Sequence, residues 1–115
     1  MRILLVDDKP ERRKWLKQLL ENKGHKVVVS TDGMAALVKV MAKNAKFLLV
    51  LTDTKMPCMT GPELVEEMKQ RRIQVPVIGM SNREECRGFY EHFWNKNEPT
   101  EILFGLIKKL TEKSP

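Results

Sequence analysis

Three aspartates stand directly after apolar runs, and they are the residues of this chain best suited to chemistry. Asp7 and Asp8 follow the apolar segment 2–6, and Asp53 ends the stretch FLLVLTD. If both runs are neighbouring parallel strands, their carboxyl ends meet at one rim of a sheet, where ligands bind. Carboxylates this close repel one another unless a cation relieves them, and an all-oxygen ligand set favours Mg²⁺. Each acid alone would more simply be a helix cap or a turn residue, so the prediction rests on their convergence.

Two further polar residues end later apolar runs. Ser81 closes VPVIGMS and Lys96 closes HFWNK. A hydroxyl donor and a point positive charge are the groups that stabilise phosphoryl oxygens beside a carboxylate. Taken singly, Ser81 would be a helix cap and Lys96 a surface lysine.

Strand and helix patterns alternate along the chain. Short apolar runs predict strands, and apolar residues three and four positions apart predict helices, with Met41 and Ile102 on inward faces. The predicted strands are residues 2–6, 26–30, 47–52, 75–80 and 92–95, and the predicted helices are residues 10–23, 32–44, 60–72 and one from 97 onward. The alternation predicts an α/β fold, a parallel sheet with helices on both faces, in one domain over residues 1–115.

The fourth crossover is unusually short. Only residues 82–91 lie between the fourth and fifth predicted strands. A parallel crossover ordinarily needs about a dozen residues, its helix included. We therefore expect a fourth helix that is shortened or absent, with Phe89 and Tyr90 filling the space that a full helix would occupy.

Composition limits the remaining possibilities. The chain has 115 residues, 42% of them hydrophobic and 31% charged, with a net charge of +6. No apolar run approaches the roughly 20 residues of a membrane span. The basic residues are scattered without interleaved aromatics, which favours solvated faces over direct nucleic-acid binding. Cys58 and Cys86 lack metal-site spacing, so we expect reduced thiols in a cytoplasmic protein.

Four segments together resemble the receiver domains of two-component response regulators. They are ILLVDDKPERRKWLKQLLENKGHKVVVSTDGMAAL, LLVLTDTKMPCMTGPEL, VPVIGMS and FWNK, and they cover essentially the whole chain. The resemblance implies a flavodoxin-like sheet in the order 2-1-3-4-5. It implies that Asp53 is a phosphoacceptor, served by a histidine kinase or phosphotransfer histidine. It also implies that Asp7, Asp8, Asp53 and the backbone carbonyl of Lys55 hold Mg²⁺.

The resemblance extends to the residues around the acceptor. Ser81 and Lys96 would hold the phosphoryl oxygens, and Phe93 falls where the family places a switch aromatic, although it fits a plain core position equally well. Such a protein is not an enzyme but a signalling switch. Its partners would be a sensor histidine kinase or phosphotransfer protein and a downstream output protein or a missing effector domain.

Several residues depart from the family pattern. Asn97 stands where the family usually has a proline after a cis bond, and a cis bond without proline costs about 3–4 kcal/mol. We therefore expect either a trans bond with a displaced Lys96 or a strained exception. Asn82 is bulkier than the usual small residue and could narrow access to Asp53, and Lys55 could pair with Asp53 or face solvent. These departures keep a pseudo-receiver, a phosphorylation-independent interaction module, as the alternative, with a small Mg²⁺-dependent phosphatase as a weaker rival.

Overall fold

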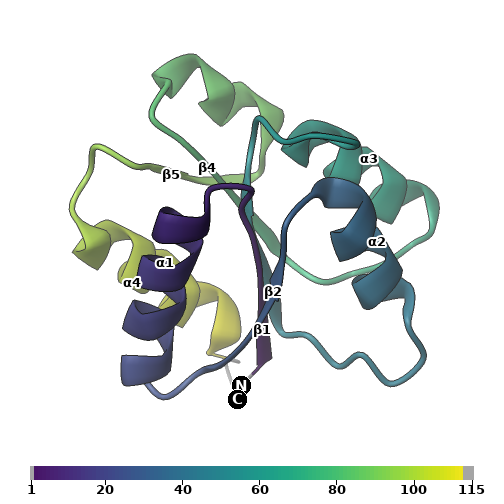
Figure 1. The fold of residues 1–115 in the computed structure, drawn as a ribbon, viewed down its shortest axis with the longest axis horizontal. Helices are drawn as coiled ribbons and strands as arrows, with labels where there is room; N and C mark the ends of the chain where they lie inside the picture. Colours follow the sequence, from purple (N-terminus) through teal and green to yellow (C-terminus); the bar gives the residue numbers. More distant parts are fainter. Residues whose placement is uncertain (1, 113–115) are drawn as a thin grey trace.

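The computed structural model describes residues 2–112 as a five-stranded parallel sheet between two layers of helices (Figure 1). The strands are β1 (Arg2–Val6), β2 (Lys26–Ser30), β3 (Leu49–Asp53), β4 (Val77–Ser81) and β5 (His92–Asn95). Their order is β2-β1-β3-β4-β5, and every pairing is parallel. The predicted α/β class, sheet order and parallel pairing are confirmed.

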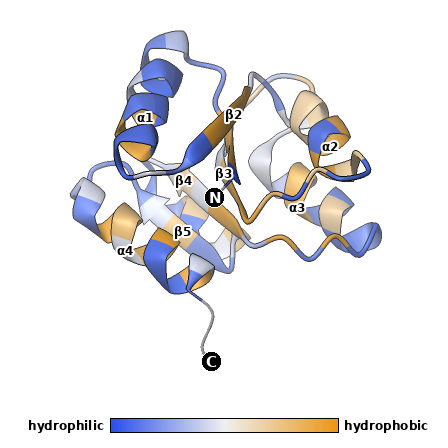
Figure 2. Ribbon diagram, turned by 90° about the horizontal axis from the view of Figure 1, so that it is seen from below, coloured by the Kyte–Doolittle hydropathy of each residue, from blue (hydrophilic) through white to orange (hydrophobic). Residues whose placement is uncertain are grey.

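Four α-helices cover the sheet, two on each face. They are α1 (Pro10–Asn22), α2 (Gly33–Met41), α3 (Gly61–Gln70) and α4 (Thr100–Thr111). Helices α1 and α4 lie on one side of the strands, and α2 and α3 on the other (Figure 1). The largely apolar strands therefore run between two layers of helices that carry both hydrophobic and hydrophilic residues (Figure 2).

Side-chain alternation on β1 explains this two-sided core. Ile3 and Leu5 join the cluster that includes Leu16 and Leu20 of α1. Leu4 and Val6 point the other way and join the cluster under α2 and α3. These four side chains of β1 are fully buried, whereas Arg2 is half-buried. Burying one such side chain contributes about 1.5–3 kcal/mol, so the central strands anchor the rim where they end.

Local signals set the helix boundaries near that rim. Pro10 begins α1, as its fixed backbone angle and missing N–H allow. The Asp32 side chain caps α2 by accepting from the amide of Ala35 at 2.8 Å. Thr60 and Glu63 form a reciprocal capping box at the start of α3.

The helices differ from the sequence prediction in length and rotation. Helix α2 ends at Met41 rather than at Asn44, because Ala42 at its C-cap is already extended, with φ −61° and ψ 135°. Met41 and Ile102 are exposed rather than inward-facing. Their spacing matches an apolar stripe, but they lie at its edge, where the neighbouring helix or sheet does not reach.

The fourth crossover contains one short 3₁₀ helix, η1 (Glu84–Phe89), in place of an α-helix. The expected shortening is confirmed. Tyr90 covers the sheet here, because its ring lies against Gly79 and its hydroxyl against Gly61. Phe89 does not fill this space, since 56% of it is exposed.

Within residues 2–112, no helix has the length and apolar character needed to cross a membrane. Both cysteines are free, with Cys58 exposed and Cys86 buried.

Candidate functional site

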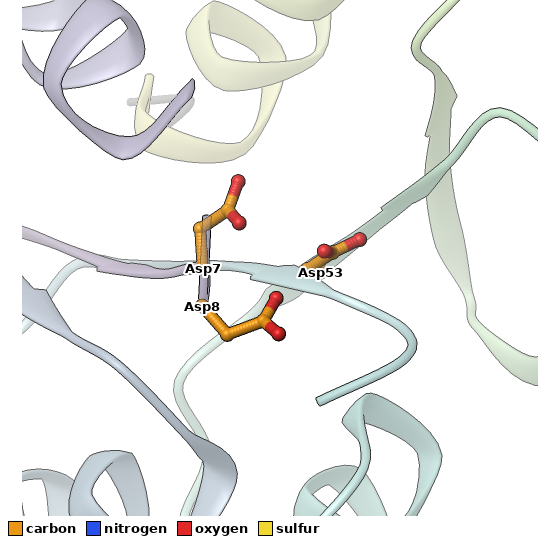
Figure 3. Close-up of side chains that lie close together, drawn as sticks. All are labelled: Asp7, Asp8 and Asp53. Atoms are coloured by element: carbon orange, nitrogen blue, oxygen red, sulfur yellow. The ribbon is translucent and has the colours of Figure 1, made fainter. Parts of the chain in front are cut away.

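The three predicted aspartates meet at the carboxyl ends of β1 and β3. One carboxylate oxygen from each of Asp7, Asp8 and Asp53 lies within 4.8 Å of the others. Figure 3 shows Asp7 and Asp8 projecting from consecutive positions beside Asp53. Asp7 is fully buried and Asp53 is 5% exposed, whereas Asp8 is half-buried. Holding two buried acids and a half-buried one together is unfavourable unless cations or donors compensate their charge.

Arg12 supplies much of that compensation, and sequence reasoning missed it. From the first turn of α1, its Nε donates to Asp7 Oδ2 at 2.6 Å and its Nη2 to Asp7 Oδ1 at 3.0 Å. The same Nη2 donates to Asp53 Oδ2 at 2.7 Å. Burial alone would lower the pKa of Arg12, but the hydrogen bonds and charges of Asp7 and Asp53 outweigh it and raise that pKa. The available signal was the Pro10 helix start, which places Arg12 one turn beyond the acid pair.

Lys96 is the second cation at Asp53. Its Nζ donates to Asp53 Oδ1 at 2.8 Å. The peptide bond before Asn97 is trans, as expected, because no cis bond occurs among the described residues. With this trans bond Lys96 still reaches Asp53, and its backbone N–H donates to the carbonyl of Ser81 at 2.8 Å, which fixes the chain beside β4.

Ser81 lies at the end of β4 but does not contact Asp53 through any hydrogen bond within residues 2–112. Its Oγ accepts from the backbone N–H of Arg83 at 3.0 Å. An accepting hydroxyl keeps its own proton, so Ser81 remains able to donate to a third group. It lines a cleft of about 580 Å³ whose walls also include Asp8, Asp53 and Lys96.

Two residues that depart from the family pattern, Lys55 and Asn82, lie on the walls of the same cleft. Lys55 is exposed, and the salt bridges described for Asp53 come from Arg12 and Lys96 instead. Asn82 is exposed, and its carbonyl accepts from the side-chain amide of Asn97 at 3.3 Å. Both residues line the cleft without closing it.

An aromatic pair connects the end of β3 to β5. Phe93 is buried and stacks on Tyr90 with ring centroids 6.0 Å apart, and the Arg87 guanidinium lies 5.0 Å from the Phe93 centroid. The Tyr90 hydroxyl lies 2.9 Å from the hydroxyl of Thr54, the residue after Asp53. Burial, aided by the charge of Asp53, raises the pKa of Tyr90 to about 12, although the Thr54 bond opposes the shift.

The donor set fits Mg²⁺ on two grounds. All three clustered side chains offer hard oxygen ligands, which Mg²⁺ prefers. Asp8 Oδ1 is also buried without a hydrogen-bond partner among the described residues, so one ligand atom is unsatisfied. Arg12, however, holds oxygens of the other two acids.

Comparisons with known proteins agree with this geometry. The family model for the response regulator receiver domain matches residues 3–93. The chain belongs to the response regulator receiver family. Receiver domains of this family act in two-component signalling.

Relatives of this receiver domain include both sensor kinases and transcriptional regulators. It is 38% identical over 81 residues to sensor histidine kinase RcsC of Salmonella typhimurium, which is 70% of this chain and 8% of that protein. It is 30% identical over 84 residues to the alkaline phosphatase synthesis transcriptional regulatory protein PhoP of Bacillus subtilis, covering 73% of this chain and 34% of that protein. The chain thus spans only part of these relatives.

A similar solved structure is the response regulator protein TrrA of Thermotoga maritima, determined in complex with Mg²⁺ and BeF. The match has a TM-score of 0.86 and 28% identity, and it covers 95% of this chain and 97% of that one. A likeness over nearly the whole length of both chains supports a single receiver fold.

Proposed function

We propose that this receiver domain accepts a phosphoryl group on Asp53 and thereby switches its protein contacts. The observation that carries the proposal is Asp53 itself, 5% exposed at the sheet rim, with Lys96 Nζ 2.8 Å from Oδ1 and two more acids beside it. The likeness to the receiver-containing kinase RcsC supports a histidine kinase or phosphotransfer histidine as donor.

The transfer is an in-line displacement at phosphorus. A carboxylate oxygen of Asp53 forms the new P–O bond while the P–N bond of the donor phosphohistidine breaks, and its electron pair leaves with the imidazole nitrogen. Lys96 and the Thr54 amide, which donates to Asp53 Oδ1 at 3.0 Å, orient the acceptor. The Ser81 hydroxyl and Lys96 then stabilise the phosphoryl oxygens.

Magnesium belongs to this proposal as the expected metal. Asp7, Asp8, Asp53 and the backbone carbonyl of Lys55 would hold it, and the solved relative TrrA was determined with Mg²⁺ and BeF. When bound, the ion neutralises charge on the transferring group.

Signalling would follow from a shift between two conformations biased by the phosphoryl group. Ser81 on β4 would respond to the phosphoryl group directly. Phe93 on β5 would respond through its contact with Tyr90. The phosphorylated conformation would be recognised in the cytoplasm by an output protein or by an effector domain elsewhere in a longer protein. The receiver would be a switch and not a turnover enzyme.

Intact mass spectrometry tests the proposal. The domain is incubated with acetyl phosphate in the presence and absence of MgCl₂, beside an Asp53→Asn variant as the matched control. We expect the mass of one phosphoryl group on the wild-type chain with Mg²⁺ and none on the variant. The same gain on Asp53→Asn would move the acceptor elsewhere.

A pseudo-receiver is the second candidate. Two features favour it, namely the Arg12 guanidinium already bound to Asp53 and the η1 helix in place of a full α-helix. Absence of any mass gain, from acetyl phosphate or from a histidine donor, would favour this reading over the first.

A further inference from the structure

Every carboxylate oxygen of Asp7 and Asp53 already has a donor. Arg12 occupies both oxygens of Asp7 and Oδ2 of Asp53, as the bond lengths of 2.6, 3.0 and 2.7 Å show. The Lys9 amide adds a bond to Asp7 Oδ1 at 2.9 Å, and Lys96 and the Thr54 amide share Asp53 Oδ1. Asp7 Oδ2 and Asp53 Oδ2 each keep a second lone pair, but Arg12 Nη2 bridges Asp7 and Asp53 and so lies where a metal that binds both acids would sit.

Arg12 is the donor best placed to be displaced. A guanidinium is a planar fork that bridges two carboxylates, so one side chain occupies the space between the acids. The Arg12 side chain is 30% exposed, whereas Lys96 is 14% exposed. Its long stem can rotate outward from the first turn of α1 without unfolding the helix. Arg13 has a different role, since it donates to the Asp7 backbone carbonyl at 2.9 Å.

Within residues 2–112, Asp8 is the acid of this cluster that receives no hydrogen bond from Arg12. Its Oδ1 is buried and has no hydrogen-bond partner among the described residues, although it belongs to the same cluster. The guanidinium thus relieves two of the three acids and leaves the third unsatisfied. A divalent ion would bind all three carboxylates and compensate their negative charge together.

We propose that Arg12 is a built-in counter-ion that competes with Mg²⁺ for Asp7 and Asp53. This inference rests on the metal site of the proposed function. In the metal-free chain the guanidinium neutralises the rim, and Mg²⁺ binds only in the fraction of molecules where Arg12 has swung out. The apparent affinity for Mg²⁺ is lowered by that fraction. Arg12 is a positioning residue that sets when the site is ready for metal.

Calorimetric titration with MgCl₂ tests the competition. Arg12→Gln removes the charge and keeps a good helix former, and Lys14→Gln removes one charge from an exposed position on the same helix as the matched control. We expect Arg12→Gln to bind Mg²⁺ about tenfold or more tightly than the wild type, as a mostly closed site requires. Lys14→Gln should stay within about twofold of the wild type, since a surface charge is largely screened. Equal or weaker binding by Arg12→Gln overturns the inference.

A second measurement needs no variant and so does not depend on its folding. In the ¹⁵N-labelled wild-type chain, the Arg12 Nε–H signal should be protected from exchange without metal and lose that protection as MgCl₂ is added. Protection that persists at saturating Mg²⁺ overturns the competition while leaving the metal site intact. If neither the wild type nor Arg12→Gln binds Mg²⁺, the metal site of the proposed function fails together with this inference.

Discussion

Replacing Gly79 with alanine should destabilise the domain through one identifiable clash. A Cβ at Gly79 would overlap the Cγ, Cδ2 and Cε2 atoms of the Tyr90 ring. The ring cannot easily move aside, because its hydroxyl lies 2.9 Å from Thr54 Oγ1 and its face stacks on Phe93. The substitution therefore forces either β4 or the end of the fourth crossover to shift.

Two opposing effects set the size of the loss. Overpacking a filled position costs about 1–3 kcal/mol. Replacing glycine by alanine in a strand returns about 0.5–1 kcal/mol, because the unfolded chain loses freedom. We expect Gly79→Ala to lower the free energy of unfolding by about 1–2 kcal/mol. In a Tyr90→Ala background the clash is gone, so the same change should become stabilising by about 0.5–1 kcal/mol.

Urea unfolding of the four proteins in this cycle measures the coupling, provided that the m-values stay constant. Gly61→Ala is the contrasting variant, because its Cβ would lie 2.6 Å from the Asp53 backbone oxygen as well as against Tyr90. Its cost should persist in the Tyr90→Ala background. An equal loss for Gly79→Ala with and without the Tyr90 ring would refute the reasoning.

Three further outcomes follow from single contacts. Lys96→Met should lower metal-free stability by about 1–3 kcal/mol in urea unfolding, because buried Asp53 keeps Arg12 but loses its other cation; no change would mean that the pair is net neutral. Tyr90 is the chain's one tyrosine, so its absorbance titration should have a midpoint near pH 12 when folded and near 10 in urea. Because the folded state raises the pKa of Tyr90, it favours the neutral phenol. The contribution of Tyr90 to the free energy of unfolding is therefore complete below pH 10 and is lost between pH 10 and 12. A folded midpoint near pH 10 would contradict this. Thr60→Ala should cost about 1 kcal/mol by removing the α3 capping box, again in urea unfolding.

The sequence was sufficient to predict the sheet and the acid cluster. Continuous apolar runs ending in Asp7 and Asp53 can be satisfied only by central parallel strands, and the register pairs Leu5 with Leu51 as that requires. Because the carboxyl ends of parallel strands share one rim, the convergence of the acids follows from topology. Lys96 was expected there because it ends an apolar run, and the β4–β5 pairing brings it to Asp53 even with a trans bond before Asn97.

Side-chain orientation was beyond sequence reasoning. Arg12 looks like one of several surface cations until α1 is docked on the sheet, which turns its first helical turn toward the rim. Met41 and Ile102 fail for the related reason that spacing defines a stripe but not its edges. In both cases the deciding quantity is the rotation of a helix about its axis, which depends on packing partners far away in the chain.

The short fourth crossover shows how chain geometry and packing constrain each other. Because Ile78 pairs with His92 and Ser81 with Asn95, the chain leaving β4 must return by three residues, about 10 Å. Six residues of 3₁₀ helix rise about 12 Å, whereas six residues of α-helix rise about 9 Å. The 3₁₀ helix, which rises further per residue, therefore completes the return within residues 82–91. Of its own residues it buries only Cys86. The sheet still needs a cover on this face, and Tyr90 provides it only because Gly79 has no side chain.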